Sequence, residues 1–228
     1  MALPAAAATP PARPIHAEIR KRALACLGER RLVTDYYRIR RRMAFSLPVK
    51  SLSLRNVTVP SITDYPWATW MTWALEERVN ALGYAAEWFH DEAAATAAAR
   101  DLDALAAWPA YRQYEQPDLS SGHCGRLMWT ALSKWRWLPP ATRARLRDAC
   151  ARHAADVLPH CRRYYGPAAS SADLLALPAP HSKLANIPLI GTIAAALTAE
   201  ASGQPTAPEL HRLVTEVYLA LLEMRSRG

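Results

Sequence analysis

The 228-residue chain is 51% hydrophobic and 21% charged, which excludes a disordered tail and a coiled-coil rod. Only 8 glycines and 2 phenylalanines occur beside 18 prolines and a large excess of alanine, a composition that favours helices over a turn-rich β-sandwich. The formal net charge of +8 is concentrated in residues 1–60, where 12 Arg or Lys face 3 Asp or Glu.

Residues 1–62 are predicted to form a basic N-terminal segment. After an Ala/Pro-rich lead, apolar residues at helical spacing predict helices over Ile15–Leu27 and from Leu32 to about Phe45. The stretch Ser46–Thr63 contains two prolines and alternating apolar residues, so it is expected to be a loop with at most one edge strand.

Residues 63–228 are predicted to form a series of longer helices separated by prolines. The expected helices are Pro66–His90, Glu92–Trp108, Asp118 or Ser120 to Pro139, Thr142–Leu158, Ser182–Glu200 and Pro208–Arg225. Helices of about 16–20 residues joined by short Pro-rich loops pack as antiparallel pairs. The sequence therefore predicts an all-α fold of antiparallel helical hairpins, either a helical layer or part of a helical toroid.

All 8 tryptophans lie between Trp67 and Trp137, and Trp67, Trp70 and Trp73 recur at every third position. Aromatic faces stack on sugar rings and bases and can hold a polymer in a groove. The same spacing also suits a bulky stripe between packed helices. Both interpretations stay open from the sequence.

Two further groups of polar residues are candidates for chemistry. The segment from Asp118 to His123 places a carboxylate and an imidazole at a helix start, and Arg126 follows one turn later. His123 is alternatively a capping or packing residue. Asn186 is an isolated amide among apolar neighbours, so it is expected to be buried and to hydrogen-bond either a substrate or the local backbone.

Signatures of metal and nucleotide cofactors are absent. Cys26, Cys124, Cys150 and Cys161 form no CxxC pair and fit no zinc spacing, so they are predicted to be small core residues. The sequence also lacks phosphate-binding glycine motifs, HExxH and GxSxG. No cofactor and no metal are expected.

The protein is predicted to be located in the cytoplasm. Met1–Arg13 lacks the charged-then-apolar order of a secretory signal, and Leu184–Ala199 contains Pro188 and is too short to span a bilayer. No membrane partner is expected.

Several runs of residues together resemble one family. They are Asp64–Trp70, Trp73–Arg78, Asp101–Pro109, Asp118–His123, and Asn186–Gly191 followed by Ala194–Leu197. Over residues 60–228 these runs resemble the toroid module of bacterial heparinase II/III-like proteins, with the Tyr-Pro-Trp and Trp-Pro runs weighing most. The resemblance implies an (α/α) toroid of helical hairpins and a polysaccharide lyase that cleaves uronic-acid polymers by β-elimination.

The resemblance also implies roles for particular residues. Asn186 would bind the uronate carboxylate, His123 would assist in proton transfer, and Arg126 or Arg78 would be the charge partner. Tyr65 and the tryptophans at 67, 70 and 73 would line the substrate cleft. The expected partner is an acidic polysaccharide or oligosaccharide.

Two departures from the family pattern indicate an incomplete module. Position 187 is Ile, where such lyases often place a histidine or tryptophan beside the asparagine, and the chain stops at Gly228 before the further hairpins and β-domain of the family. The toroid is therefore predicted to be incomplete and truncated, and the chain to be inactive. Its open edge would leave an apolar helix face that favours self-association.

Two other classes of function compete with this hypothesis. A non-catalytic helical interaction module would bind an anionic partner such as nucleic acid through Arg38–Arg42, although such a run also suits a solvated helix face. A helical barrel of the glycosidase or terpene-cyclase kind is the weakest alternative, because the sequence has no Asp-rich metal motif and no convincing carboxylate pair.

Overall fold

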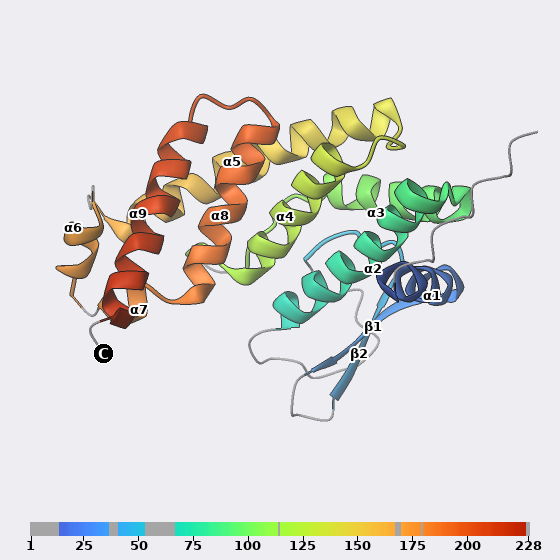
Figure 1. Ribbon diagram of the computed structural model, residues 1–228, viewed down its shortest axis with the longest axis horizontal. Helices are drawn as coiled ribbons and strands as arrows, with labels where there is room; N and C mark the ends of the chain where they lie inside the picture. The colour runs from blue at the N-terminus through green and yellow to red at the C-terminus, as the bar shows by residue number, and fades with distance from the viewer. Residues whose placement is uncertain are drawn as a thin grey trace, which may run out of the picture.

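The computed structural model describes residues 14–36, 41–52, 67–113, 115–166, 170–178 and 180–226. These residues are mostly helical, with one short β-hairpin, so the predicted all-α class is confirmed (Figure 1). The elements are α1 Pro14–Gly28, β1 Arg31–Tyr36, β2 Arg41–Ser46, α2 Trp67–Phe89, α3 Glu92–Ala106, α4 Leu119–Lys134, α5 Pro140–Tyr165, α6 Ser171–Leu175, α7 Pro180–Lys183, α8 Asn186–Ala201 and α9 Ala207–Ser226.

The helix predicted from Leu32 to about Phe45 is wrong. This stretch contains strands β1 and β2, which pair antiparallel with Leu32 opposite Phe45. Leu32 and Phe45 are buried, whereas Val33, which follows Leu32, is exposed. Burial that alternates from one residue to the next is typical of a strand with one face on the core. The spacing of apolar residues also fits a helix, and only packing of the hairpin against α2 decides between the two.

Two predicted helix boundaries also change at prolines. The helix predicted to end at Pro159 continues as α5 to Tyr165. The proline costs one backbone hydrogen bond, and burial of Cys161 and Tyr165 on the core face of the helix offsets that cost. The helix predicted from Ser182 instead starts at Asn186, which places Pro188 in the first turn of α8, where no intrahelical N–H bond is required.

The helices form repeated hairpins in two layers. In Figure 1, α2, α4 and α8 lie side by side, with α3 and α5 behind them. Glu76 in the middle of α2 pairs with Arg126 in the middle of α4, and Glu87 near the C-terminal end of α2 pairs with Arg136, two residues beyond the end of α4. The first helices of successive hairpins are therefore parallel. This is the local arrangement expected in a toroid, whose closure stays a prediction.

Close approach of α4 and α8 depends on two glycines. A Cβ at Gly122 would lie 2.5 Å from Ile190, and one at Gly191 would lie 2.7 Å from the backbone nitrogen of Asp118. These contacts bring the N-terminal ends of α4 and α8 together. The N-terminal ends of α2, α4 and α8 thus lie at one end of the helical layer (Figure 1).

The described part of the N-terminal segment packs on this layer. Ala23 of α1, Phe45 of β2 and Val49 share a buried core with the start of α2, where Trp67 stacks on Phe45 at a centroid distance of 6.5 Å. Nε1 of Trp108 donates a 2.8 Å hydrogen bond to the carbonyl of Val49. The domain boundary predicted at residue 62 itself lies outside the described residues.

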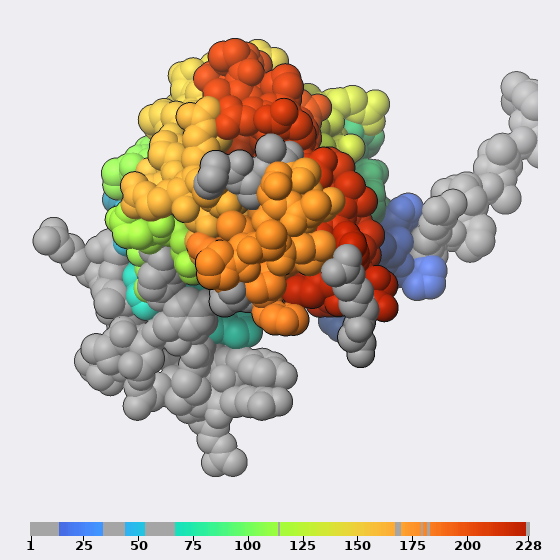
Figure 2. All heavy atoms as spheres, turned by 90° about the vertical axis from the view of Figure 1, so that its left-hand side faces the viewer, coloured from blue at the N-terminus to red at the C-terminus, as the bar shows by residue number. Residues whose placement is uncertain are grey.

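Helices α6 and α9 form the side of the molecule that is farthest from α1 and the β-hairpin (Figure 1 and Figure 2). Three neighbouring apolar residues of α9 are about half-exposed: Tyr218, Leu219 and Leu222. This surface fits the apolar edge that the sequence analysis expected, and its self-association stays a prediction. Within the described ranges, no helix combines the length and apolar character needed to cross a membrane.

Candidate functional site

A carboxylate, an imidazole and a guanidinium meet between α2 and α4. Oε2 of Glu76 lies 2.6 Å from Nδ1 of His123 and 2.7 Å from Nη2 of Arg126. Nη2 of Arg126 also lies 2.9 Å from Nδ1 of His123. The side chains of Glu76 and His123 are nearly buried, whereas that of Arg126 is 38% exposed.

The protonation pattern follows from the shared acceptor. Both Nη2 of Arg126 and Nδ1 of His123 donate to the same Glu76 oxygen, because a carboxylate accepts two hydrogen bonds and a guanidinium accepts none. The proton of a neutral His123 ring is then on Nδ1, and Nε2 carries the lone pair. Nε2 takes part in no hydrogen bond with the described residues. Glu76 therefore orients an imidazole whose second nitrogen is available for proton transfer.

Two tryptophans extend this group into a stacked row. The ring of Trp73 stacks on His123 at a centroid distance of 5.7 Å and an interplanar angle of 16°. Trp70 in turn stacks on Trp73 at 5.3 Å and 14°. Trp73, in the middle of the row, is 43% exposed, so part of its indole reaches the surface. We call Trp70, Trp73, Glu76, His123 and Arg126 the α2–α4 cluster.

Helical periodicity and a cap position the cluster. Trp70, Trp73 and Glu76 are each three residues apart and therefore share one face of α2. On the neighbouring helix, Asp118 is the N-cap, and its side chain accepts hydrogen bonds from the backbone N–H groups of Ser121 and Gln113 at 2.8 and 2.6 Å. The cap fixes where α4 begins, and hence where His123 lies along it.

Arg126 has one further unsatisfied donor. Its Nε–H is buried and has no hydrogen-bond acceptor among the described residues. A buried donor without a partner is costly, so such a group favours an acceptor supplied by water or a ligand. Together with the exposed part of the guanidinium, it makes Arg126 a candidate anion contact.

The structure brings four of the sequence-predicted site residues together and separates the others. Trp70, Trp73, His123 and Arg126 join the cluster. Trp67 does not, because it is buried against Phe45. Tyr65 lies outside the described residues, as do the side chains of Arg38–Arg42.

Arg78 is not a surface ligand, contrary to the sequence-based expectation. It is buried on another face of α2, where Nε donates to Oδ2 of Asp101 and Nη1 donates to Oε2 of Glu29, both at 2.8 Å. Arg78 therefore joins α1, α2 and α3 rather than the candidate site.

Asn186 is exposed rather than buried, which corrects the inference from its apolar neighbours. It is the first residue of α8, while Leu184 and Pro188 on either side point into the core. Its place at the N-terminal end of α8 puts it at the same end of the layer as the cluster. Within the described part of the chain, it forms no hydrogen bond with Glu76, His123 or Arg126.

Glu76 is the functional residue that sequence reasoning did not assign. Its available signal was the three-residue step from Trp70 through Trp73, which places a carboxylate on the aromatic face. That signal is weak, because an acidic residue on a helix is usually solvated. Its role depends on α4, whose His123 is 47 residues away in the sequence.

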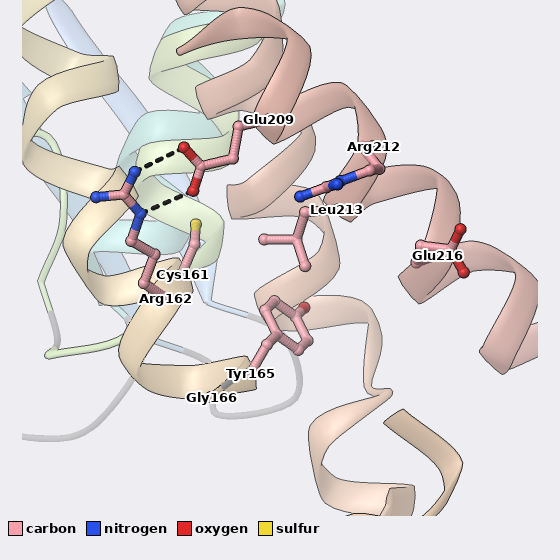
Figure 3. A pocket seen from close by; sticks show the side chains of 8 residues that line it. All are labelled: Cys161, Arg162, Tyr165, Gly166, Glu209, Arg212, Leu213 and Glu216. Atoms are coloured by element: carbon pink, nitrogen blue, oxygen red, sulfur yellow. Dashed lines mark hydrogen bonds and ion pairs between the residues drawn. The ribbon is translucent and has the colours of Figure 1, made fainter. Parts of the chain in front are cut away.

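A separate cavity lies between α5 and α9, and Figure 3 shows its lining. Arg162 and Glu209 face one another across it through two hydrogen bonds of 2.7 and 2.6 Å. The negative charges of Glu209 and Glu216 balance the positive charges of Arg162 and Arg212. The volume of the cavity is only about 80 Å³. This cavity is best explained as the seam where α9 is joined to α5.

The four cysteines are free and buried, so their prediction as core residues is confirmed. Burial raises the pKa of Cys150 to about 12 and that of Cys161 to about 11, and it also raises the pKa of Cys26 and Cys124. Thiolate, the reactive form, is therefore scarce near pH 8. We expect iodoacetamide to leave all four thiols of the folded chain largely unmodified. Mass spectrometry checks this, with the same reaction in denaturant as the control; rapid labelling of the folded chain would contradict it.

Comparison with family models, with curated proteins and with solved structures finds no match to this chain. Among the described residues, no group of three or more His, Cys, Asp or Glu side chains is arranged to hold a metal ion.

Proposed function

We propose that the α2–α4 cluster binds an acidic carbohydrate that contains uronic acid. The observation that carries the proposal is the exposed indole of Trp73 beside the half-exposed guanidinium of Arg126. The part of the Trp73 indole that its stacked neighbours leave exposed offers apolar surface to the C–H groups of a sugar ring, and a guanidinium pairs with a carboxylate. The two groups together select a ring that carries a carboxylate.

The same cluster suits a lyase-type reaction, which we propose as its chemistry. In β-elimination a base removes the proton at C5, the C4–O bond breaks, and a double bond forms between C4 and C5. The departing oxygen then takes up a proton. Nε2 of His123, whose Nδ1 donates to Glu76, is suited to accept the C5 proton and then to give a proton to the departing oxygen. Arg126 would hold the carboxylate whose charge grows as the C5 proton leaves.

Binding to oligouronides tests the proposal directly. Trp73→Ala is expected to weaken binding about tenfold, or about 1.4 kcal/mol, because it removes the exposed aromatic surface of the cluster. Titration calorimetry of wild-type and variant chains against oligogalacturonate and oligoguluronate measures this change. Absorbance of unsaturated uronide in the same samples reports any elimination.

A matched control is available in the same helix. Trp88 is also 43% exposed, but it lies at the other end of α2, where its ring packs at a tilt against those of Tyr84 and His16. Trp88→Ala should therefore leave binding unchanged. Equal losses in the two variants, or no binding of any uronate polymer by the wild type, would refute the proposed function.

A further inference from the structure

A second concave surface lies between the start of α4, the end of α5 and α7. It is an open groove of about 440 Å³, lined by Glu115, Gln116, Arg163, Tyr164 and Lys183. Its walls are the loop before α4, the C-terminal end of α5 and the last residue of α7. We call it the Lys183 groove.

The side chains of the groove are held in place by one another. Nζ of Lys183 donates a 2.7 Å hydrogen bond to the carbonyl of Tyr164 and lies 4.1 Å from the centroid of its ring. Arg163 Nη1 lies 3.3 Å from Oε2 of Glu115, and both side chains are largely exposed. Two cations, one carboxylate and one phenol thus line the groove. This set gives it a net positive charge and groups able to bind sugar hydroxyls.

The groove and the cluster are neighbours through the first turns of α4 and α8. Gln116 lies three residues before Leu119, where α4 begins, and Lys183 lies three residues before Asn186, where α8 begins. Ile190 of α8 contacts Gly122, the residue before His123. The segment that lines the groove at Gln116 thus runs directly into the helix that carries His123 and Arg126.

We propose that the Lys183 groove is a second subsite, which binds another carboxylate-bearing sugar of the same chain that occupies the α2–α4 cluster. The inference rests on the proposed function and adds to it the length of the ligand. Lys183 and Arg163 contact the carboxylate, and the hydroxyl of Tyr164 contacts the ring hydroxyls. A short oligosaccharide fills the cluster alone, whereas a longer one fills both sites.

A length series of oligouronides tests the second subsite. The wild type is expected to bind longer oligomers, such as hexamers and octamers, more tightly than dimers. Lys183→Gln keeps the length of the side chain and removes its charge, so it should weaken binding of the long oligomers about tenfold and leave that of dimers unchanged. Arg163→Gln, at an exposed position where the fold is not at risk, should show the same pattern to a smaller degree.

Lys134→Gln is the matched control. Lys134 also lies over an aromatic ring, that of Trp129, but at the C-terminal end of α4, away from the groove. It should bind all lengths like the wild type. Dimer binding with no effect of Lys183→Gln on long oligomers would overturn the second subsite and leave the proposed function standing. Failure of every oligomer to bind the wild type would overturn both.

Discussion

Replacing Arg78 with methionine is expected to lower the free energy of unfolding by about 3–5 kcal/mol, because the buried carboxylate of Asp101 loses its buried partner and keeps only the longer, 3.5 Å contact with the half-exposed Arg100. The side chain of Asp101 is 0% exposed and that of Arg78 is 3% exposed. A loss of this size is a large part of the about 5–15 kcal/mol that stabilises a typical domain. Urea denaturation followed by circular dichroism measures it.

Two comparisons separate the buried pair from a general effect of losing an arginine. Arg22→Met removes an ion pair with Glu77 across the same α1–α2 interface, but both side chains are at least half-exposed. Its expected cost is below about 1 kcal/mol. The double variant Arg78→Met, Asp101→Leu removes both buried charges and should be more stable than Arg78→Met alone. If Arg78→Met and Arg22→Met cost the same, the buried pair does not stabilise the fold.

The helices were predictable where their signals are local. Asp118 was a candidate cap before α4, and α3 and α9 follow apolar residues at helical spacing. The hairpin β1–β2 was not predictable in this way. Leu32 and Phe45 lie on opposite strands, and only their pairing and their burial against α2 select strands over a helix. That choice is made by contacts distant in the sequence.

The candidate site divides in the same manner. The sequence alone was enough to select His123, Arg126 and Trp73, because their residue types indicate proton transfer, anion binding and aromatic contacts. Glu76 could not, because its partners belong to another helix. Arg78, two residues later, faces a different set of helices and became a structural residue. Residue type indicates the candidates, and helix packing decides which of them meet.

Acidification is expected to destabilise the fold through His153, a fully buried histidine that joins α4, α5 and α8. Its Nε2 lies 2.9 Å from the carbonyl of Ser121, which can only accept, so the ring proton is on Nε2. Nδ1 then accepts from the hydroxyl of Thr198, also at 2.9 Å. Burial lowers the pKa of His153 to about 4, although the nearby charge of Asp156 opposes this shift.

The direction of the pH effect follows from where the proton binds. Between about pH 6.5 and pH 4 the unfolded chain protonates this histidine while the folded chain does not, so stability is complete above about pH 6.5 and falls as the pH is lowered. A pKa difference of this size corresponds to at most about 3 kcal/mol. His153→Gln keeps a donor for Ser121 but cannot titrate, so its urea midpoint should fall less than that of the wild type over this range. His211→Gln removes an exposed imidazole and controls for the substitution itself. Parallel pH profiles for wild type and His153→Gln would show that the acid sensitivity arises elsewhere, for example from the carboxylates of Glu87 and Glu209. Hydrogen bonds from Arg136 lower the pKa of Glu87, and those from Arg162 lower the pKa of Glu209, in each case against the opposing effect of burial.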